Sequence, residues 1–249
     1  MLLDQRRRHV LELIEEKGFI SLHELATKTG VSESTLRRDL EYLDGIRQVR
    51  RTRGGAAYVG ESVVSLEERS VTSLVEKQRI ARSISETIGS GETVLLDGGT
   101  TTLEVARALI GKELQVVTNS LAIANLLVNS PGVELIFLGG YLHPKTGVTL
   151  GPLLNLALSQ LQVPRMVFSV GGVTEKGLFN SNTLLVEAER RMIDAAERVV
   201  LAVDSRKFGK AALSPLCPLD RVHEIVTDEG IPEDWRKRIE ELGIELRIA

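Results

Sequence analysis

Residues 93–102 read Thr-Val-Leu-Leu-Asp-Gly-Gly-Thr-Thr-Thr, and this stretch decides the fold class of most of the chain. Its first half is a short apolar run of the kind that forms a buried strand. Two glycines follow, and apolar residues then recur at helical spacing at Leu103, Ala106 and Leu109. A strand, a tight loop and a helix in this order are typical of one unit of an α/β fold.

Similar units continue towards the C-terminus. Further apolar runs are long enough to form strands, and helical segments lie between most of them. Because apolar strands that alternate with helices are buried on both faces, they predict a mainly parallel sheet covered by helices on both sides. We therefore expect an α/β domain over residues 76–249. The runs are Leu114–Val117, Val133–Leu138, Met166–Val170, Val199–Val203 and Glu224–Val226.

The N-terminal part of the chain has the pattern of three short helices. Apolar residues at helical spacing within Val10–Ile14 predict the first helix, which Gly18 ends. The second helix begins at Ser21–Glu24, a capping box in which the serine hydroxyl and the glutamate carboxylate each accept from a backbone N–H. Ser32 is a suitable N-cap for the third helix, expected over Glu33–Leu43.

Two candidate strands follow the third helix, at Gln48–Arg51 and Ala56–Val59. They are joined by Thr52–Gly55, whose two glycines permit the positive φ values of a hairpin turn. The order helix, helix, turn, helix and hairpin predicts a winged helix-turn-helix domain over residues 1–59. Residues 60–75 are polar without a firm period, and they predict a linker to the α/β domain.

The composition is that of a globular protein in which positive charge is locally concentrated. Of 249 residues, 43% are hydrophobic and 26% are charged, so two domains with sizeable cores are expected. The net charge is −3, yet six arginines and three acidic residues lie between Arg37 and Arg53. A short basic segment in a weakly acidic chain is the electrostatic pattern of a DNA-contacting surface.

The sequence indicates neither export nor membrane insertion. The first residues lack the basic-then-apolar order of a signal peptide, and no uncharged apolar run approaches the length of a membrane span. The single cysteine, Cys217, lies in an apolar stretch, which predicts a packed thiol instead of a reactive one. We expect a cytoplasmic protein that does not bind membranes and uses no cofactor.

Residues 31–40, Val-Ser-Glu-Ser-Thr-Leu-Arg-Arg-Asp-Leu, carry the most specific functional pattern. A recognition helix presents short polar side chains at its N-terminal end to base edges in the major groove. Arginines one turn later can bind guanine or a phosphate, and arginines on a wing can contact the backbone or minor groove. The alternative is a solvated charged face, on which Arg38 pairs with Glu33 or Glu41. The candidate DNA-contacting residues are Ser32, Glu33, Ser34, Thr35, Arg37, Arg38, Arg50, Arg51 and Arg53.

Asp97–Thr102 lies between a strand and a helix and is a candidate anion-binding loop. Backbone N–H groups and peptide dipoles at a helix N-terminus favour a phosphate, although a simple turn with an N-cap has the same pattern. Polar clusters also follow later strands, at the sheet edge where α/β folds bind ligands. Arg190 and Lys207 would add positive charge, or Arg190 would instead form a surface ion pair with Glu187 or Asp194. The candidate ligand-binding residues are Asp97, Gly98, Gly99, Thr100, Thr101, Thr102, Thr118, Asn119, Ser120, Gly139, Gly140, Gly171, Gly172, Glu187, Arg190, Asp204 and Lys207.

The order of these motifs resembles that of DeoR-type repressors. The N-terminal signature of that family runs through a Leu-Ala pair, a Val-Ser turn, Thr-(Ile/Leu)-Arg-Arg-Asp-Leu and Arg-x-His-Gly-Gly-Ala. It matches residues 24–56 here, with Arg53 where histidine is usual. Motifs of the family's sensor domain also match, and the resemblance covers almost the whole chain. The matching sensor motifs are Asp97–Thr102, Thr118–Ser120, a Gly-Gly pair, Glu187–Met192, Asp204–Gly209 and Thr227–Asp228.

The resemblance implies a winged helix-turn-helix followed by a sensor domain related in fold to ribose-5-phosphate isomerase. It implies a repressor of a carbohydrate-catabolic operon, relieved by a phosphorylated sugar or related metabolite. The implied partners are double-stranded operator DNA and further copies of the chain, in a dimer or larger assembly. Arg165 stands where the family has aspartate, so one edge of the ligand site departs from the family pattern.

A sugar-phosphate isomerase with an appended DNA-binding domain is the main alternative. That chemistry needs a carboxylate base beside the substrate, and the related isomerases carry an Asp-Gly-Ala-Asp-Glu run after the central strand. Here Phe168–Thr174 holds no carboxylate, Glu187 remains as a candidate base, and four scattered histidines predict no metal site. We expect a regulator without catalytic residues. The large second domain argues against a third hypothesis, a purely architectural DNA binder.

Overall fold

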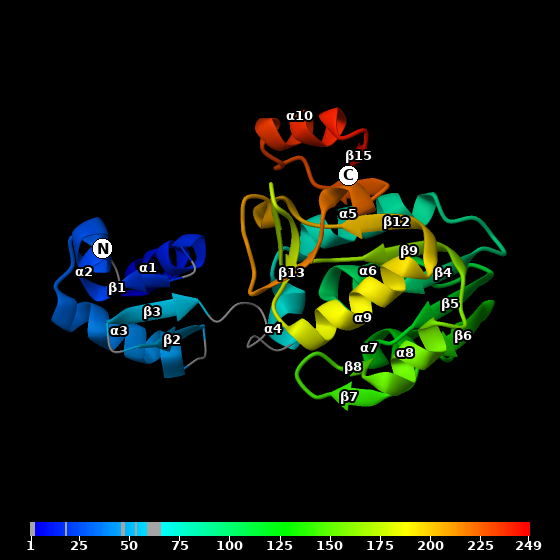
Figure 1. Cartoon of the computed structure of the whole chain (residues 1–249), viewed down its shortest axis with the longest axis horizontal. Coiled ribbons are helices and arrows are strands. Elements are labelled where there is room, and N and C mark those ends of the chain that lie inside the picture. Colours follow the sequence, from blue (N-terminus) through cyan, green and yellow to red (C-terminus); the bar gives the residue numbers. More distant parts are fainter. Residues whose placement is uncertain (1–2, 18, 46–47, 53, 59–65) are drawn as a thin grey trace. The chain divides into compact units, whose positions relative to one another are not determined.

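The computed structural model describes residues 3–17, 19–45, 48–52, 54–58 and 66–249. The chain divides into two units, residues 1–65 and residues 66–249 (Figure 1). Within the expected linker 60–75, residues Leu66–Val71 form helix α4, and the next helix begins at Leu74. The expectation of a linker is wrong for this part, because α4 packs against helix α6 (Thr100–Ala108) of the second unit.

The described residues of the first unit follow the predicted order of a winged helix-turn-helix. The Ser21 hydroxyl accepts from the Glu24 N–H at 3.1 Å, as expected, but the Glu24 carboxylate pairs with Lys17. The capping box is therefore half formed. Gly30 ends the second helix with a φ of 68°. The elements are α1 (Leu3–Lys17), β1 (Phe19–Ser21), α2 (Leu22–Thr29), α3 (Glu33–Gly45), β2 (Val49–Arg51) and β3 (Gly55–Tyr58).

The small sheet of the first unit has β3 between β1 and β2, with antiparallel pairing throughout. Strand β1 was not predicted, because three residues are too few to show an alternating pattern. A Cβ on Gly55 would lie 2.1 Å from the Ile20 carbonyl oxygen, so the close approach of β3 to β1 requires glycine. The three helices and the sheet share one core, which contains Val10, Ile14, Ile20, Leu25, Leu36, Leu40, Leu43, Val49 and Ala56.

A seven-stranded parallel sheet forms the centre of the second unit. Its strand order is β15-β14-β12-β9-β4-β5-β6. The chain runs outward from β4 to β6 and then returns to β9, so the strand order reverses between β4 and β9. Ligands of open α/β sheets bind at such a switch point, beyond the carboxyl ends of the strands. The strands are β4 (Thr93–Leu96), β5 (Leu114–Thr118), β6 (Val133–Phe137), β9 (Val163–Phe168), β12 (Ala196–Ala202), β14 (Glu224–Thr227) and β15 (Glu245–Ile248).

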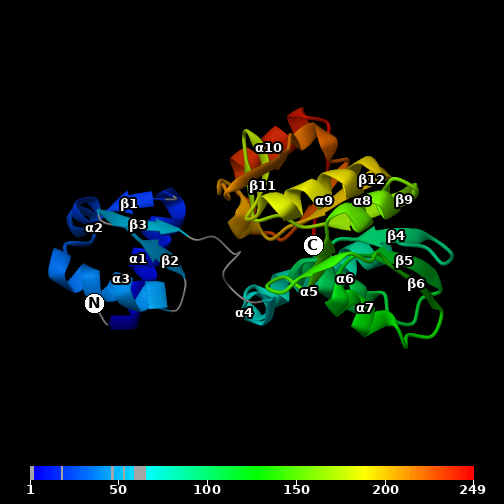
Figure 2. The ribbon, with the colours of Figure 1, turned by 60° about the horizontal axis from the view of Figure 1, so that its bottom comes forward.

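Helices cover both faces of this sheet, as the apolar strands predicted (Figure 2). Side chains alternate along β4: Leu95 packs in the core that includes α8, α9 and α10, whereas Val94 and Leu96 pack in the core that includes α5, α6 and α7. None of the helices in the described residues has the length and apolar composition to cross a membrane. The helices are α5 (Leu74–Glu86), α6 (Thr100–Ala108), α7 (Leu121–Leu127), α8 (Pro152–Leu158), α9 (Thr183–Asp194) and α10 (Glu233–Glu241).

Two of the observed strands begin earlier than their apolar runs. Strands β9 and β12 start at Val163 and Ala196, because their parallel pairing continues through half-exposed residues. Two small antiparallel sheets and two short 3-10 helices were not predicted, since each segment spans only three or four residues. These elements are β7 (Tyr141–His143), β8 (Val148–Leu150), β10 (Gly172–Thr174), β11 (Gly177–Asn180), η1 (Ser205–Lys207), β13 (Ser214–Cys217) and η2 (Leu219–Arg221).

Candidate nucleic-acid interface and ligand site

The predicted recognition helix is α3, and its N-terminal end carries a cluster of hydroxyl groups. Ser32 precedes the helix, with its Oγ 3.1 Å from Ser34 Oγ and 3.0 Å from Thr35 Oγ1. The side chains of Ser32, Glu33 and Ser34 are exposed, and that of Thr35 is half-buried. This end of the helix therefore presents the short polar surface that the sequence predicted.

Arg37 and Arg38 lie on the exposed face of α3. The Arg37 Nη2 atom is 3.6 Å from Glu33 Oε2, a loose pair between two exposed side chains. Arg38 was given the alternative role of pairing with Glu33 or Glu41. In the part of the chain that the structure describes, Arg38 forms no such ion pair, because Glu33 lies near Arg37 and Glu41 near Arg51.

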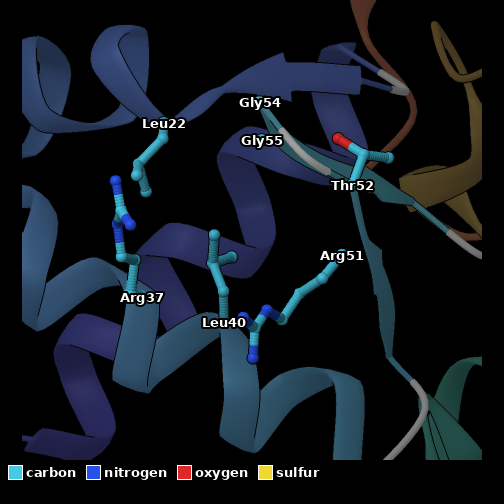
Figure 3. A pocket seen from close by; sticks show the side chains of 7 residues that line it. All are labelled: Leu22, Arg37, Leu40, Arg51, Thr52, Gly54 and Gly55. Atoms are coloured by element: carbon cyan, nitrogen blue, oxygen red, sulfur yellow. The ribbon is translucent and has the colours of Figure 1, made fainter.

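The wing lies beside α3 and encloses a groove of about 180 Å³ (Figure 3). Arg37 and Leu40 rise from the helix on one side, and Arg51 and Thr52 stand on the hairpin opposite. The Arg51 Nη1 atom is 3.3 Å from Glu41 Oε1, so this arginine also ties the wing to α3. Arg50 is exposed on β2. The predicted contact Arg53 lies outside the described residues.

A buried ion cluster that was not predicted anchors α3 to α1. Asp39 is buried, and its two carboxylate oxygens accept from Arg6 at 2.6 and 3.0 Å and from Arg7 Nε at 3.2 Å. The Arg7 guanidinium carbon lies 3.7 Å from the centre of the Tyr42 ring. The aspartate of the Arg-Arg-Asp motif therefore orients the helix and leaves the two preceding arginines facing solvent.

In the second unit, the glycine loop and the first turn of α6 follow β4 directly. Gly99 is the N-cap residue in extended conformation, and its carbonyl accepts from Thr102 Oγ1 at 3.0 Å. No side chain caps the helix, and its first turn holds no acidic residue. Because the N–H groups of this turn have no side-chain partner, the buried end of α6 favours an anion.

The loop after β5 lies next to the glycine loop, because Leu96 and Thr118 are register partners. The Thr118 hydroxyl donates to the Leu96 carbonyl at 2.8 Å, and Ser120 Oγ caps α7 by accepting from the Ile123 N–H at 3.4 Å. These two side chains therefore have structural partners. Asn119 Nδ2 donates to the Thr149 carbonyl at 3.0 Å, but its Oδ1 is buried without a partner.

Most of the predicted glycines allow close packing of the chain against itself. A Cβ on Gly98 would lie 2.0 Å from Val148 Cγ1, and one on Gly172 would lie 2.1 Å from the Lys210 carbonyl oxygen. Gly140 has a φ of 149°, and its Cβ would lie 2.6 Å from the Leu150 carbonyl oxygen. A Cβ on Gly171 would meet Ala212 Cβ at 3.2 Å, whereas Gly139 faces open space. The need for glycine at Gly98, Gly140 and Gly172 is therefore explained by close contact with other parts of the chain, without reference to a ligand.

Glu187 and Arg190 are not brought to the glycine loop. Glu187 is exposed on α9 and accepts from Asn155 Nδ2 at 3.0 Å. Arg190 donates to the carbonyl oxygens of Leu216 and Pro215, at 2.7 and 2.8 Å, and so fastens α9 to β13. The suggested ion pair of Arg190 with Glu187 or Asp194 is wrong as well; Arg191 and Arg221 occupy those partners.

The turn after β12 lies at the carboxyl edge where it was expected. Asp204 is buried and accepts from Arg206 Nε at 2.9 Å. Asp228, at the end of the neighbouring β14, accepts from the Ser205 N–H at 2.7 Å and holds the turn. Lys207 is the last residue of this short 3-10 helix.

Charged side chains gather at the same edge around Asp97. Burial raises the pKa of Asp97 to about 6, and the Gly98 N–H and the Arg69 guanidinium oppose that rise. Burial also lowers the pKa of Lys77 to about 8, an effect that the charge of Asp204 opposes. Two cationic groups, from α4 and α5, therefore lie within electrostatic range of the edge that carries the glycine loop.

Glu189 is a buried carboxyl group at this site that the sequence-based prediction missed. Its Oε1 accepts from Asn180 Nδ2 at 2.5 Å. Burial, and then the charge of Asp97, raise the pKa of Glu189 well above its ordinary range. A signal was present, because Glu189 lies three residues from both Val186 and Met192, on the buried face of α9.

Arg165, the departure noted in the sequence, lies away from this edge. It is near the start of β9 and donates to the Thr87 carbonyl and Oγ1, at 3.0 and 3.1 Å. Arg165, which stands where the family has aspartate, therefore contacts the C-terminal end of α5. It does not lie among the loops at the carboxyl ends of the sheet strands. Within the described residues, no three His, Cys, Asp or Glu side chains are grouped so as to hold a metal ion.

Comparison with known proteins gives matches for both units. Residues 6–62 match the model of the DeoR-like helix-turn-helix domain, and residues 72–229 match that of the DeoR C terminal sensor domain. The glycerol-3-phosphate regulon repressor of Escherichia coli K12 is 32% identical over 98% of each chain. The uncharacterized HTH-type transcriptional regulator YulB of Bacillus subtilis is 31% identical, over 99% of this chain and 96% of its own.

Solved structures of lower similarity include ribose 5-phosphate isomerase A from Methanocaldococcus jannaschii. It has 16% identity and a TM-score of 0.39, with 53% of each chain covered. The delta subunit of eIF2B from Chaetomium thermophilum has 16% identity and a TM-score of 0.41, with 72% of this chain and 57% of its own covered. The two matching domain models and the full-length relatives are decisive: the chain belongs to the DeoR family of transcriptional regulators.

Proposed function

We propose that this regulator represses a carbohydrate-catabolic operon by binding its operator, and that a phosphorylated sugar or related metabolite relieves the repression. One observation carries the effector half of the proposal. The buried N-terminus of α6 has no side-chain cap and no acidic residue in its first turn, and it lies at the switch point between β4 and β9. Such a helix end binds a phosphoryl group through backbone N–H groups.

The DNA-binding half uses the exposed face of α3 and the wing. Arg37 and Arg38 are one turn from the hydroxyl cluster of Ser32, Ser34 and Thr35, as in a helix that reads the major groove. Arg50 is exposed on the wing beside it. We assign base contacts to the N-terminal end of α3 and phosphate contacts to the arginines.

Repression is relieved when the effector binds more tightly to the conformation that has low DNA affinity. We further propose that two or more copies assemble, so that paired winged helices meet two half-sites of the operator. Exposed leucines at Leu153 and Leu156 on α8, and at Leu184 at the start of α9, provide apolar surface for that assembly. Light scattering of the purified chain measures the number of copies directly.

The experiment that tests the proposed function has two steps. The full chain is screened by thermal shift against ribose 5-phosphate, glycerol 3-phosphate and other sugar phosphates, with inorganic phosphate and free sugars as controls. A duplex selected from a random library then reports DNA affinity with and without each stabilising compound. We expect at least one phosphorylated compound to stabilise the chain and weaken DNA binding. The absence of both effects across the panel would contradict the proposal.

We propose regulation without catalysis. The residue considered as a possible base, Glu187, is exposed and held by Asn155 on the outer side of α9. The segment after β9 supplies no carboxylate to the switch point. Incubation of the purified chain with aldose and ketose phosphates tests this part, and measurable turnover of any of them would favour the isomerase alternative.

A further inference from the structure

Seven buried side-chain polar atoms of the second unit have no hydrogen-bond partner within the described residues: Arg69 Nε, Asn119 Oδ1, Ser130 Oγ, Glu189 Oε2, Ser214 Oγ, Thr227 Oγ1 and Arg236 Nε. Three of them, Glu189 Oε2, Asn119 Oδ1 and Ser214 Oγ, belong to residues that are 3%, 1% and 3% exposed. Buried polar groups in folded proteins almost always have a partner. An unpaired buried oxygen in a sensor domain therefore points to a ligand that supplies the missing bond.

Two of these atoms belong to one cluster, which we call the α9 polar cluster: Glu189, Asn180 and Ser214. Asn180 Nδ2 donates to Glu189 Oε1 at 2.5 Å, and this leaves Oε2 as the free carboxyl oxygen. Ser214 is the register partner of Asn180 across β11 and β13. Side chains that are directly opposite in an antiparallel pair have Cβ atoms roughly 5 Å apart. The free hydroxyl of Ser214 is thus next to the amide that holds Glu189.

Contacts link the α9 polar cluster to the glycine loop. A Cβ on Gly171 would lie 3.5 Å from Asn180 Oδ1, and one on Gly99 would lie 3.8 Å from Ser169 Cβ. Gly171 and Ser169 belong to the same short segment after β9, at the switch point. The α9 polar cluster and the N-terminus of α6 therefore both adjoin this segment, and they form the two sides of the candidate site. The charge of Asp97 raises the pKa of Glu189, so the two carboxyl groups lie within electrostatic range of each other.

The two sides have opposite hydrogen-bonding character. The first turn of α6 offers donors and a positive dipole end, whereas the α9 polar cluster offers a carboxyl group and a hydroxyl. Inorganic phosphate can accept hydrogen bonds from the first turn of α6 but has no sugar or polyol hydroxyl group for the α9 polar cluster. A compound with a phosphoryl group at one end and hydroxyl groups at the other satisfies both.

We propose that Glu189 is a specificity-determining residue of the effector site, where its free oxygen and the Ser214 hydroxyl bind a hydroxyl group of a phosphorylated polyol or sugar. This inference rests on the proposed function, since it assigns the end of the ligand opposite the phosphoryl group.

The protonation of Glu189 is compatible with an anionic ligand nearby. Because burial and the Asp97 charge raise its pKa well above the ordinary range, the neutral form is favoured. A neutral carboxyl group does not repel a phosphate, and it has one O–H to donate. With Oε1 occupied by Asn180, that O–H belongs to Oε2, the atom without a partner.

The test compares variants that keep or remove the hydrogen-bonding atoms of the Glu189 side chain. Glu189→Leu removes the polar oxygens at similar size, and Glu189→Gln keeps the shape and donor of a neutral carboxyl group. Glu187→Leu is the matched control on the exposed side of the same helix. The affinities of the full chain for ribose 5-phosphate, glycerol 3-phosphate and inorganic phosphate are measured by calorimetry, with circular dichroism to verify folding.

We expect the wild-type chain to bind one of the two phosphate esters more tightly than inorganic phosphate. Glu189→Leu should lose about tenfold or more of that affinity, the loss of one good hydrogen bond, and keep its affinity for inorganic phosphate. Glu189→Gln and Glu187→Leu should bind the ester almost as the wild type does. If Glu189→Leu does not fold, Ser214→Ala takes its place, with the same expected direction.

Two other outcomes overturn the inference in distinguishable ways. If the wild type binds an ester and Glu189→Leu binds it equally well, Glu189 has no role in specificity, while the proposed effector class stands. If the wild-type chain binds neither ester more tightly than inorganic phosphate, the proposed function fails for these compounds, and the assignment of Glu189 fails with it.

Discussion

Replacing both Arg37 and Arg38 by alanine tests whether the exposed face of α3 contacts DNA. The Arg37 side chain is 66% exposed, and its ion pair with Glu33 is loose at 3.6 Å, so little holds it to the protein. Each phosphate contact contributes about 0.9 to the slope of the logarithm of affinity against the logarithm of salt concentration. The loss of two contacts should therefore flatten the slope by about 1.8 for each bound domain.

The assay is fluorescence anisotropy of a labelled duplex, titrated at salt concentrations between about 50 and 200 mM. Over this fourfold range of salt concentration, the affinity of the variant should therefore fall by a factor about twelvefold smaller than the affinity of the wild type does. The matched control is Arg79→Ala with Arg82→Ala, which removes the same charge from the exposed face of α5 in the second unit. An unchanged slope in the α3 variant, or an equal flattening in the control, would refute the assignment.

Three further predictions follow from single positions. Gly98→Ala should lower the free energy of unfolding by about 1–3 kcal/mol in urea denaturation, because its Cβ would meet Val148 Cγ1 at 2.0 Å; unchanged stability would show that the loop is loosely packed. Burial raises the pKa of the Cys217 thiol to about 11, so a disulfide reagent at pH 8 should modify the folded chain roughly a hundredfold more slowly than the unfolded chain; equal rates would contradict this. The pKa of Asp97 rises from 3.8 to about 6 on folding, so the folded state keeps its proton to higher pH, and this group makes stability fall as the pH rises through that range. Asp97→Asn should remove that fall, as measured by urea denaturation at several pH values, and an unaltered pH dependence would argue against a buried, neutralised carboxyl group.

The fold class was predictable because its signals extend over long segments. The central strands β4, β5 and β14 are buried along nearly their whole length, and each contains apolar residues that mark it in the sequence. The strands β1, β7 and β10 are not visible in the sequence, because a segment of three residues is too short to show an alternation of apolar and polar residues. Helix α4 escaped prediction because its stability comes from contact with α6, which a local pattern does not reveal.

The charged residues that matter most were hidden within helical patterns. Asp39 in α3, Lys77 in α5 and Glu189 in α9 each lie on the buried stripe of an otherwise amphipathic helix. A charged side chain at such a position must be paired, neutralised or ligand-bound, so it marks a structural or functional centre. In α9, the motif match favoured Glu187 and Arg190 instead, whereas the helical period alone would have favoured Glu189.

The glycines show a different limit of sequence-based prediction. Gly98 and Gly172 were assigned to ligand contact because glycine allows close approach. The structure shows that the approaching groups are Val148 and the Lys210 carbonyl. Sequence identifies that a position needs glycine, but not which part of the molecule occupies the space next to it.

The central claim is that a phosphoryl group bound at the N-terminus of α6 controls DNA binding, and Thr101→Val tests it most directly. Thr101 is buried in the first turn of that helix, and valine keeps its shape while removing the hydroxyl. DNA affinity is measured for both chains as the stabilising sugar phosphate is added. We predict at least about a fivefold loss of wild-type DNA affinity, and in Thr101→Val the same starting affinity with a much weaker response. A variant that responds as fully as the wild type would contradict the claim.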